Sequence, residues 1–242
     1  MKRMDDCFID LTVTSPPYDN LRNYNGYEFE FEKIAKELFR VTKEGGVVVW
    51  VVGDATINGS ETGTSFKQAL FFKEIGFNLH DTMIFTKHKA PCNEEASFRY
   101  KDTFEFMFVL SKGKPKTFNP VKIKTLSAGK TVLKGQVNKE GIYQKRNSIT
   151  KELRVKDNIW RYSFTNDKTL HPAVFPEKLV KEHIYSWSNE GDLIYDCFMG
   201  SGTTAKMAHL QKRKWIGSEM SKEYTDLANK RIEKYINQTT LF

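Results

Sequence analysis

Two short stretches of the sequence combine residue types that could bind a nucleoside and act on an amine. The first, DCFMGSGTT (residues 196–204), follows an apolar run and opens a helical pattern. Glycines at a strand-to-helix turn let a ligand approach the backbone, and a helix start offers N–H groups. Glu219 ends the next apolar run, KWIGSE, where a carboxylate can accept hydrogen bonds from ribose hydroxyls. The spacing predicts a nucleoside pocket; the alternative is a tight turn followed by a surface Glu.

The second stretch, TSPPY (residues 14–18), ends the apolar run IDLTVTS. Two successive prolines lack N–H donors and stop a strand, which leaves its last carbonyls able to accept hydrogen bonds. Ser15 adds a side-chain oxygen, and Tyr18 adds an aromatic face. These acceptors suit the exocyclic amino group of a nucleic-acid base that stacks on the ring of Tyr18. A diproline turn with a packed Tyr is the alternative.

Alternating strand and helix patterns must position these two stretches. Strands are expected at 9–15, 46–54, 81–86, 103–111, 192–198 and 214–219, and helices at 31–41, 65–75, 176–187, 203–210 and 222–235. This alternation predicts an α/β fold with a mostly parallel, doubly wound sheet. Ligands of such sheets bind at the carboxyl ends of the strands.

The order of the motifs resembles that of one enzyme family over nearly the whole chain. TSPPY comes first, HPAVFPEKL (residues 171–179) follows, and DCFMGSGTT comes last. This order is similar to that of the β-group DNA amino-methyltransferases, which act on cytosine N4 or adenine N6. The resemblance implies a Rossmann-like methyltransferase sheet with S-adenosylmethionine as the cofactor. It assigns the cofactor to Asp196, Phe198, Gly200, Gly202, Thr203, Glu219, His171 and Pro172.

The resemblance also implies a mechanism. The catalytic residues would be Ser15, Pro16, Pro17 and Tyr18, and the methyl group would pass directly to the amino group of a base flipped out of the duplex. Family members usually begin with an additional strand and an acidic residue that helps to hold the adenine of the cofactor. Because this chain starts at MKRMDDCFIDL, that N-terminal edge strand is expected to be missing.

The positive charge of the chain is concentrated in one segment. Residues 112–165 contain 14 Lys or Arg and 3 Asp or Glu, whereas the formal net charge of the whole chain is +8. Lysines can neutralise phosphates, so we expect this segment to be a basic target-recognition insertion that binds double-stranded DNA, with Lys145 and Arg146 among its contacts. A solvated basic loop is the alternative. The catalytic domain would then comprise residues 1–111 and 166–242.

Composition excludes several other classes of protein. The 242 residues are 39% hydrophobic, which is typical of a globular chain, and no apolar run approaches the length of a membrane span. Three cysteines and no leader sequence favour a reducing, cytoplasmic location. The five histidines show no metal-ligand spacing, so no metal is expected. A homodimer is left open.

Several residues and functions keep alternative interpretations. Asp54 is expected to cap the turn after its strand, although it could lie beside the catalytic loop. Cys92 is expected to be a packing residue and not a nucleophile. Because Ser15 opens the SPPY tetrapeptide, cytosine N4 is favoured over adenine N6 as the target. An RNA or protein-glutamine methyltransferase and a catalytically silent nucleic-acid-binding subunit remain as further alternatives.

Overall fold

The chain forms two compact units in the computed structural model. The structure describes residues 1, 3–17, 29–87, 99–137, 139, 141–162 and 175–238, and at residues 134, 136, 144, 146 and 238 it describes the backbone alone. The first unit, here called the sheet unit, comprises Met1–Asn119 and Asn158–Phe242. The second, called the ribbon unit, comprises Pro120–Asp157. Each unit is described separately below.

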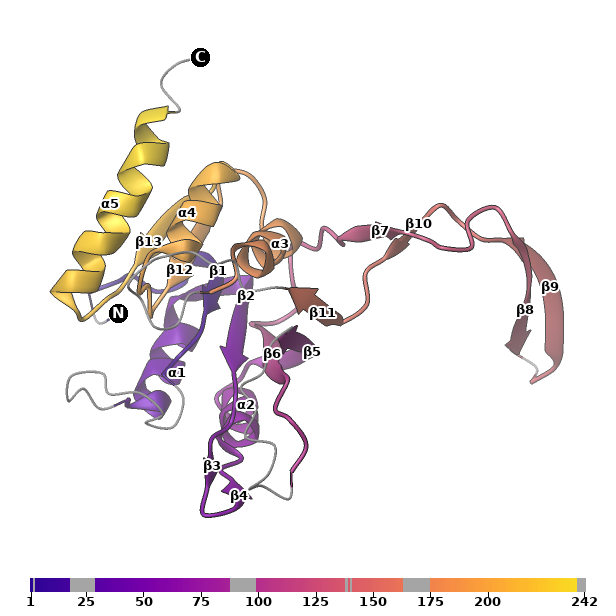
Figure 1. Cartoon of the computed structure of the whole chain (residues 1–242), viewed down its shortest axis with the longest axis horizontal. Coiled ribbons are helices and arrows are strands. Elements are labelled where there is room, and N and C mark those ends of the chain that lie inside the picture. The colour runs from indigo at the N-terminus through magenta and orange to yellow at the C-terminus, as the bar shows by residue number, and fades with distance from the viewer. Residues whose placement is uncertain are drawn as a thin grey trace. The chain divides into compact units, whose positions relative to one another are not determined.

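A seven-stranded sheet forms the centre of the sheet unit (Figure 1). Its strands follow the order β11-β5-β6-β2-β1-β12-β13, in which β6 runs antiparallel to both of its neighbours and all other pairs are parallel. This confirms the predicted mostly parallel α/β sheet. The strands are β1 (Ile9–Thr14), β2 (Thr42–Val52), β5 (Asn78–Lys87), β6 (Phe104–Ser111), β11 (Ile159–Tyr162), β12 (Leu193–Asp196) and β13 (Lys214–Gly217).

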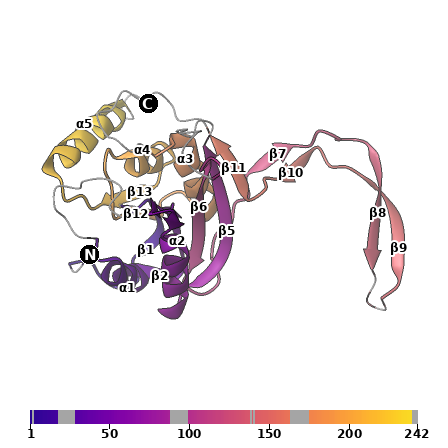
Figure 2. The same ribbon diagram turned by 60° about the horizontal axis from the view of Figure 1, so that its bottom comes forward.

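Helices cover both faces of this sheet, as Figure 2 shows. The helices α1 (Phe31–Val41) and α2 (Thr64–Glu74) pack on one face, and α3 (Glu177–Trp187) and α4 (Thr203–Leu210) pack on the other. The last helix, α5 (Lys222–Gln238), lies against the start of α4, and a short hairpin, β3 (Thr56–Ile57) with β4 (Ser60–Glu61), precedes α2. Apolar spacing predicted the ranges of α1 and α4 without error, since each helix buries one face only.

The central strand β2 explains why the two helix layers share one sheet. Val47, Val49 and Val51 are buried in the core beside α3 and α4. Val48 and Trp50 alternate with them and are buried in the core beside α1 and α2. A strand covered on both faces has no polar side, so it forms a continuous apolar run in the sequence.

The sheet ends at β13 on the side of the predicted nucleoside pocket. Among the described residues, β13 pairs with β12 and has no strand on its other side. The N-terminal edge strand found in family members is not among the strands of the described residues. The cofactor motif therefore lies next to an edge strand.

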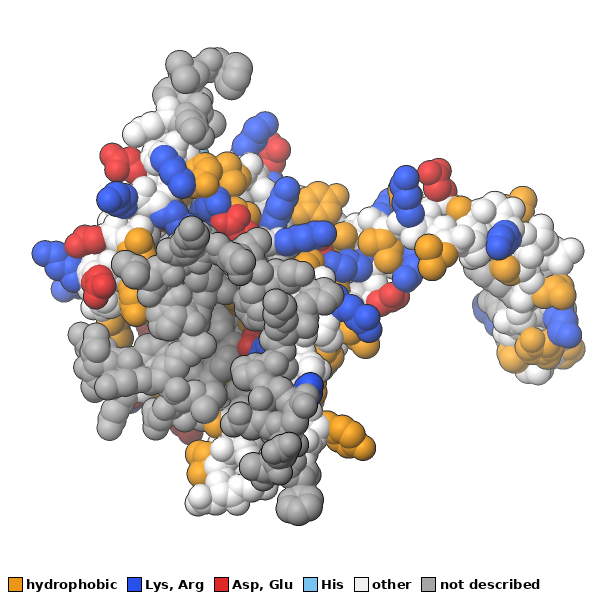
Figure 3. Space-filling view, in the orientation of Figure 1, with side chains coloured by type: hydrophobic (Ala, Val, Ile, Leu, Met, Phe, Trp, Pro, Cys, Tyr) orange, Lys and Arg blue, Asp and Glu red, His pale blue; other side chains and the backbone are white. Residues whose placement is uncertain are grey.

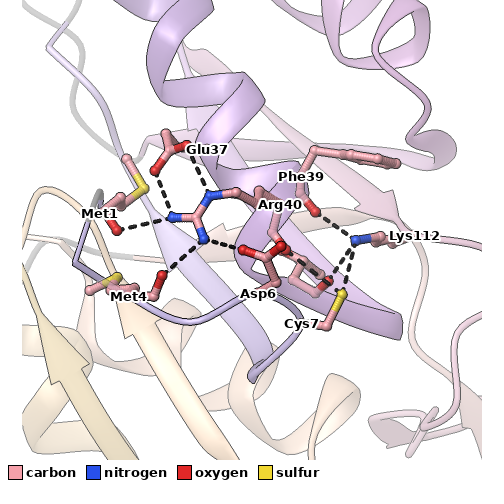
Figure 4. A network of polar contacts seen from close by, with 9 residues as sticks. Met1, Met4, Asp6, Cys7, Glu37, Phe39, Arg40 and Lys112 are labelled. Carbon is pink, nitrogen blue, oxygen red and sulfur yellow. Dashed lines mark hydrogen bonds and ion pairs between the residues drawn. The ribbon is translucent and has the colours of Figure 1, made fainter.

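Arg40, near the end of α1, holds the N-terminal segment in place before β1 (Figure 4). Its guanidinium donates to the carbonyls of Met1 at 3.1 Å and Met4 at 2.9 Å, to the Asp6 carboxylate and to the Glu37 carboxylate. The Cys7 N–H also donates to the Arg40 carbonyl at 3.0 Å. These bonds set the direction from which the chain enters β1.

Two asparagines mark the junctions with the ribbon unit. The Asn119 N–H donates to the Ser186 carbonyl at 2.8 Å, and its amide donates to the Tyr185 carbonyl at 3.1 Å. At the other junction, the Asn158 carbonyl accepts from the Ile84 N–H at 2.9 Å, and its amide donates to the Thr82 carbonyl at 3.1 Å. Both junctions are therefore held by bonds within the sheet unit.

The ribbon unit is a long antiparallel hairpin, although no strand period was found in its sequence. Its strands are β7 (Lys122–Lys124), β8 (Thr131–Val137), β9 (Tyr143–Ile149) and β10 (Leu153–Val155), with β8 paired to β9 and β7 to β10. No period was found there because most of the described side chains of this ribbon are exposed, so burial imposes no apolar repeat on its sequence. The ribbon unit covers less of the chain than the predicted insertion at 112–165, because residues 112–119 and 158–162 belong to the sheet unit.

Candidate functional site

Parallel pairing of β1 with β12 brings the two predicted motifs together. Leu11 pairs with Ile194 and Thr12 with Tyr195, so both strands run toward the same edge of the sheet. SPP follows β1 directly, and the loop Cys197–Gly202 follows β12. Two stretches separated by about 180 residues in the sequence therefore leave the sheet side by side, as expected for a site at the carboxyl ends of parallel strands.

Asp196 links the two motifs. Its carboxylate is buried and accepts hydrogen bonds from the Thr14 hydroxyl at 2.6 Å, the Thr204 hydroxyl at 2.7 Å and the Phe198 N–H at 3.0 Å. Burial raises the pKa of the Asp196 carboxyl, and the three hydrogen bonds oppose this shift. The predicted cofactor ligand thus serves as a junction between β1, the loop and α4, and a direct contact of this carboxylate with the cofactor stays a prediction.

Both glycines of the loop after β12 adopt a backbone conformation that favours glycine, and Gly202 has a second reason to lack a side chain. Gly200 has a φ of +49° and Gly202 a φ of +79°, values in the left-handed region that favours glycine. A Cβ at Gly202 would also lie 3.0 Å from the Cβ of Ala228 and 3.1 Å from Cδ1 of Ile232 in α5. Gly202 therefore allows α5 to pack closely against the start of α4.

Glu219 lies two residues after the end of β13, which stops at Gly217 and not at residue 219, and its side chain holds the loop after β12. Its Oε2 accepts the Gly200 N–H at 2.8 Å, and its Oε1 accepts the N–H groups of Met220 and Ser221, each at 2.9 Å. The side chain is only partly buried. A carboxylate has about four lone-pair positions, so Oε2 keeps capacity for a ribose hydroxyl in addition to its backbone partner.

Arg231 in α5 is a site residue that the sequence interpretation missed. Its guanidinium donates to the Ser201 carbonyl and hydroxyl, each at 3.2 Å, to the Thr203 hydroxyl at 3.0 Å and to Glu177 at 2.7 Å. The Arg231 side chain is 8% exposed. In the sequence, this role of Arg231 is indicated only by its position three residues after Ala228, which places both residues on the buried face of α5.

Glu177, at the start of α3, completes this network. It accepts from Lys206 of α4 at 2.6 Å as well as from Arg231 of α5. Burial disfavours the charged form of this carboxylate, but the ion pairs with Lys206 and Arg231 outweigh that effect and lower the pKa of Glu177. One carboxylate therefore joins three helices behind the cofactor loop.

The remaining predicted residues that the structure describes lie at the end of β1, in the loop after β12 and on β9. Pro16 is buried, and Ser15 and Pro17 are partly buried at the end of β1. Phe198 packs edge-on against Phe29, with ring centroids 5.6 Å apart. Three predicted site residues, Tyr18, His171 and Pro172, lie outside the described residues. Lys145 and Arg146 lie on β9 of the ribbon unit.

Asp54 and Cys197 both lie near the ends of strands of the sheet, and each has a structural role. The Asp54 carboxylate accepts the Ser65 N–H at 2.8 Å and the Ser65 hydroxyl, so Asp54 binds the first turn of α2 and not the turn directly after its own strand. Cys197 is buried, and burial raises the pKa of its thiol, so it is not an activated nucleophile. Cys92 lies outside the described residues.

Within the described ranges, no group of three or more His, Cys, Asp or Glu side chains could hold a metal ion. None of the described helices is both long and apolar enough to cross a membrane.

The loop and its surroundings fit a cofactor that carries a nucleoside. The first turn of α4 has N–H groups without acceptors inside the helix, beside the left-handed Gly200 and Gly202. Glu219 offers a carboxylate at the end of the neighbouring strand, and Phe198 offers an aromatic ring at the start of the loop. These are the donors, acceptor and ring that a ribose and an adenine require.

The Thr14–Asp196 hydrogen bond can be tested against a neighbour on the same strand. Thr14→Val should lower the free energy of unfolding by about 1–3 kcal/mol, because a buried carboxylate loses one of its donors. Thr12 is equally buried, and its hydroxyl has no hydrogen-bond partner among the described residues. Thr12→Val should therefore leave stability unchanged or raise it. Urea unfolding of both variants is the measurement, and equal losses would contradict the role given to Asp196.

The role of Arg231 can be tested with the adjacent lysine as the control. Arg231→Met should weaken binding of S-adenosylmethionine by about tenfold, equivalent to about 1.4 kcal/mol, because the loop loses its bonds at Ser201 and Thr203. Lys230 is exposed, so Lys230→Met should change the Kd by less than about twofold. Calorimetric titration below the melting temperature of each variant measures both values. Wild-type affinity in folded Arg231→Met would show that the loop does not depend on Arg231.

Comparisons with known proteins agree with this arrangement. Residues 9–230 match the model of the N6/N4 methyltransferase family, described as DNA methylase. The orphan methyltransferase M.BamHII of Bacillus amyloliquefaciens is 56% identical over 248 residues, a match that covers 97% of this chain and 92% of that relative. The type II methyltransferase M.HpaI of Haemophilus parainfluenzae is 28% identical over 256 residues, covering 98% of this chain and 72% of the relative.

Solved structures share the fold. The PvuII DNA methyltransferase (cytosine-N4-specific) has a TM-score of 0.67 at 20% identity and matches 98% of this chain and 87% of its own. The M1.HpyAVI–SAM complex has a TM-score of 0.62 at 24% identity and matches 93% and 89%. Because the family model spans most of the sequence and one relative shares more than half of its residues, this chain belongs to the N6/N4 DNA methylase family and is an S-adenosylmethionine-dependent DNA amino-methyltransferase.

Proposed function

We propose that this enzyme methylates the N4 amino group of cytosine in a specific sequence of double-stranded DNA. The observation that carries the proposal is the Thr14–Asp196 hydrogen bond of 2.6 Å, which holds the end of β1 against the loop after β12. Ser15 follows Thr14 directly, so a base bound at Ser15 would lie next to a cofactor bound on that loop.

The residues after β1 would hold and orient the amino group. Ser15 and the Pro16 carbonyl would accept its two N–H groups, which directs the nitrogen lone pair away from them, and Tyr18 would stack on the base. Pro16 and Pro17 have no N–H groups, so this stretch cannot continue β1 as a hydrogen-bond donor to a neighbouring strand. The base must leave the duplex to reach these groups.

The loop residues would hold the cofactor on the other side. Glu219 would accept the ribose hydroxyls, and Phe198, Gly200, Gly202, Thr203, His171 and Pro172 would line the remaining contacts. S-adenosylmethionine supplies, when bound, a methyl group carried on a positively charged sulfur. Positioning of both reactants by rigid neighbours would provide most of the acceleration, and no nucleophile of the enzyme is required.

Cytosine N4 is chosen over adenine N6 because of the residue type at position 15. Family members with Ser at the first position of the tetrapeptide are more often cytosine N4 enzymes, and those with Asp or Asn more often adenine N6 enzymes. The hydroxyl of Ser15 can both accept and donate hydrogen bonds, whereas a carboxylate only accepts them.

A cytoplasmic location is part of the same proposal, since DNA is the proposed substrate.

The product of the reaction tests this choice. Duplex DNA incubated with the enzyme and S-adenosylmethionine should contain N4-methylcytosine after digestion to nucleosides and mass spectrometry. N6-methyladenine as the sole product would refute the cytosine assignment. Tritium transfer from labelled cofactor to single-stranded RNA or to protein, without transfer to duplex DNA, would refute DNA as the substrate.

The two sides of the site can be separated by substitution. Tyr18→Ala should abolish methyl transfer and leave the Kd for S-adenosylmethionine within about twofold of wild type, because the ring would contact the base. Glu219→Ala should weaken cofactor binding, since it removes the ribose acceptor and the partner of the Gly200 N–H. Calorimetry and methyl-transfer assays measure both variants. Equal losses of cofactor affinity would show that the two-sided assignment is wrong.

A further inference from the structure

An ion pair of the sheet unit lies at the same edge of the sheet as Ser15. The Lys87 ammonium lies 2.9 Å from Oε1 of Glu105. Lys87 is the last residue of β5, and Glu105 is the second residue of β6. Because β6 runs antiparallel to β2 and β5, its first residues lie where the parallel strands end. Ser15 follows the end of β1 at this edge.

Both members of the pair lie on the face of the sheet that α3 and α4 cover. Side chains alternate between the two faces of a strand. Lys87 is two residues after Phe85, and Glu105 is two residues before Met107. Phe85 and Met107 are both buried in the core beside α3 and α4. The ion pair therefore continues that face to the edge of the sheet.

Ser15 belongs to the same face. It is two residues after Val13, which is buried in the same core. A residue before a proline favours extended backbone, so the alternation of β1 continues to Ser15. The residue proposed to bind the amino group and the ion pair therefore share one face and one edge.

One strand, β2, lies between Ser15 and the pair. Because β2 separates β1 from β6, the backbones of these two strands are about 10 Å apart. Val52, the last residue of β2, pairs with Phe106, so Gly53 reaches the level of Glu105. Gly53 has no side chain to stand between Ser15 and Glu105. A base held at Ser15 would thus face the ion pair across β2.

Contacts on both sides of Lys87 set the direction of its side chain. Lys87 pairs with Tyr162 of β11, whose hydroxyl donates to Glu182 of α3. The Lys87 ammonium instead lies against Glu105 of β6, on the side of β5 that faces β1. Lys87 therefore extends toward Ser15 and away from the outer strand.

The Lys87 side chain is less exposed than lysine side chains usually are. Lys and Arg side chains stand out from the surface in Figure 3, whereas Lys87 is 19% exposed and Glu105 14%. The cost of removing two charges from water offsets much of their attraction, so such a pair adds little stability by itself. An ammonium has three N–H donors, and the contact with Oε1 of Glu105 takes up one of them.

We propose that Lys87 donates a hydrogen bond to the carbonyl oxygen O2 of the flipped cytosine, and that Glu105 is the positioning residue that directs Lys87 toward it. This inference rests on the proposed cytosine N4 function. When the amino group is held at Ser15, the atoms left on that edge of the ring are N3 and O2, which are both acceptors. Adenine has no oxygen at the corresponding position, so a donor placed there selects cytosine after the base has been flipped.

The test removes the same hydrogen bond from the enzyme and from the DNA. Lys87→Met keeps an unbranched side chain and removes the donors. In the DNA, a 2-aminopyridine C-nucleoside replaces the target cytosine, because it keeps the amino group and the ring nitrogen but lacks the carbonyl oxygen. After the target sequence has been mapped, kcat/KM is measured for both enzymes on both duplexes. Such a cycle isolates the interaction between the two groups.

Lys43 supplies the matched control. Its ammonium lies 2.7 Å from the Asp10 carboxylate, so it also joins two neighbouring strands, but near the starts of β1 and β2 at the opposite edge. Lys43→Met breaks that ion pair away from the site. Glu105→Gln keeps Lys87 and removes the charge that positions it. Calorimetric titration with S-adenosylmethionine shows that each variant is folded.

On the cytosine duplex, Lys87→Met should lose about 10- to 150-fold in kcat/KM, the effect of a hydrogen bond to a charged group. On the analogue duplex, the wild type should lose a similar factor, and Lys87→Met should lose less than about twofold more. Glu105→Gln should lose more on cytosine than on the analogue. Lys43→Met should stay within about twofold of wild type on both duplexes. Where transfer to the analogue is too slow, the Kd of each duplex with S-adenosylhomocysteine present replaces kcat/KM.

Two results would overturn the inference and leave the proposed function intact. Wild-type kcat/KM in folded Lys87→Met would exclude the proposed hydrogen bond, and equal losses on both duplexes would give the ion pair a role in the fold alone. If Lys87→Met does not bind the cofactor, equal losses of Glu105→Gln on the two duplexes have the same meaning. If the wild type forms no N4-methylcytosine in any duplex, the proposed function itself fails, and this inference fails with it.

Discussion

The buried carboxylate of Asp196 is the constraint on which the site depends. A carboxylate without solvent needs donors, and the three it has come from β1, from its own loop and from α4. The buried Asp196 carboxyl group is stabilised only while all three of these elements keep their positions, because each supplies one of its hydrogen bonds. The requirement of one side chain for hydrogen bonds thus fixes the distance between the end of β1 and the loop after β12, the two stretches proposed to bind the amine and the cofactor.

A second set of bonds holds the loop from its far side. Glu219 binds the Gly200 N–H, and Arg231 binds Ser201 and Thr203, so the residues between β12 and α4 are held both from the stretch after β13 and from α5. Glu177 balances the charge of Arg231 and Lys206. A loop that is already ordered loses little entropy when a ligand binds, which is how rigid neighbours contribute to affinity and to rate.

Patterns that arise from burial could be predicted from the sequence, and patterns that arise from pairing could not. The run at Val47–Val52 and the spacing in Phe31–Val41 reflect a covered strand and a one-sided helix. The partnership of Thr14 with Asp196 depends on sheet register, and that of Arg231 with Ser201 depends on helix packing, so neither leaves a local signal. The ribbon left no signal for a further reason, since its described large side chains, such as Leu133 and Ile149, are exposed.

The two asparagines at the junctions have an evolutionary consequence. Asn119 and Asn158 make their bonds to α3 and β5, and none of these bonds involves a residue between Pro120 and Asp157. A hairpin of another length or sequence can therefore be exchanged between them while the hydrogen bonds of Asp196, Glu219 and Arg231 persist. Under the proposed role of this segment in DNA binding, such an exchange would alter the contacts with DNA and leave the bonds that organise the site in place.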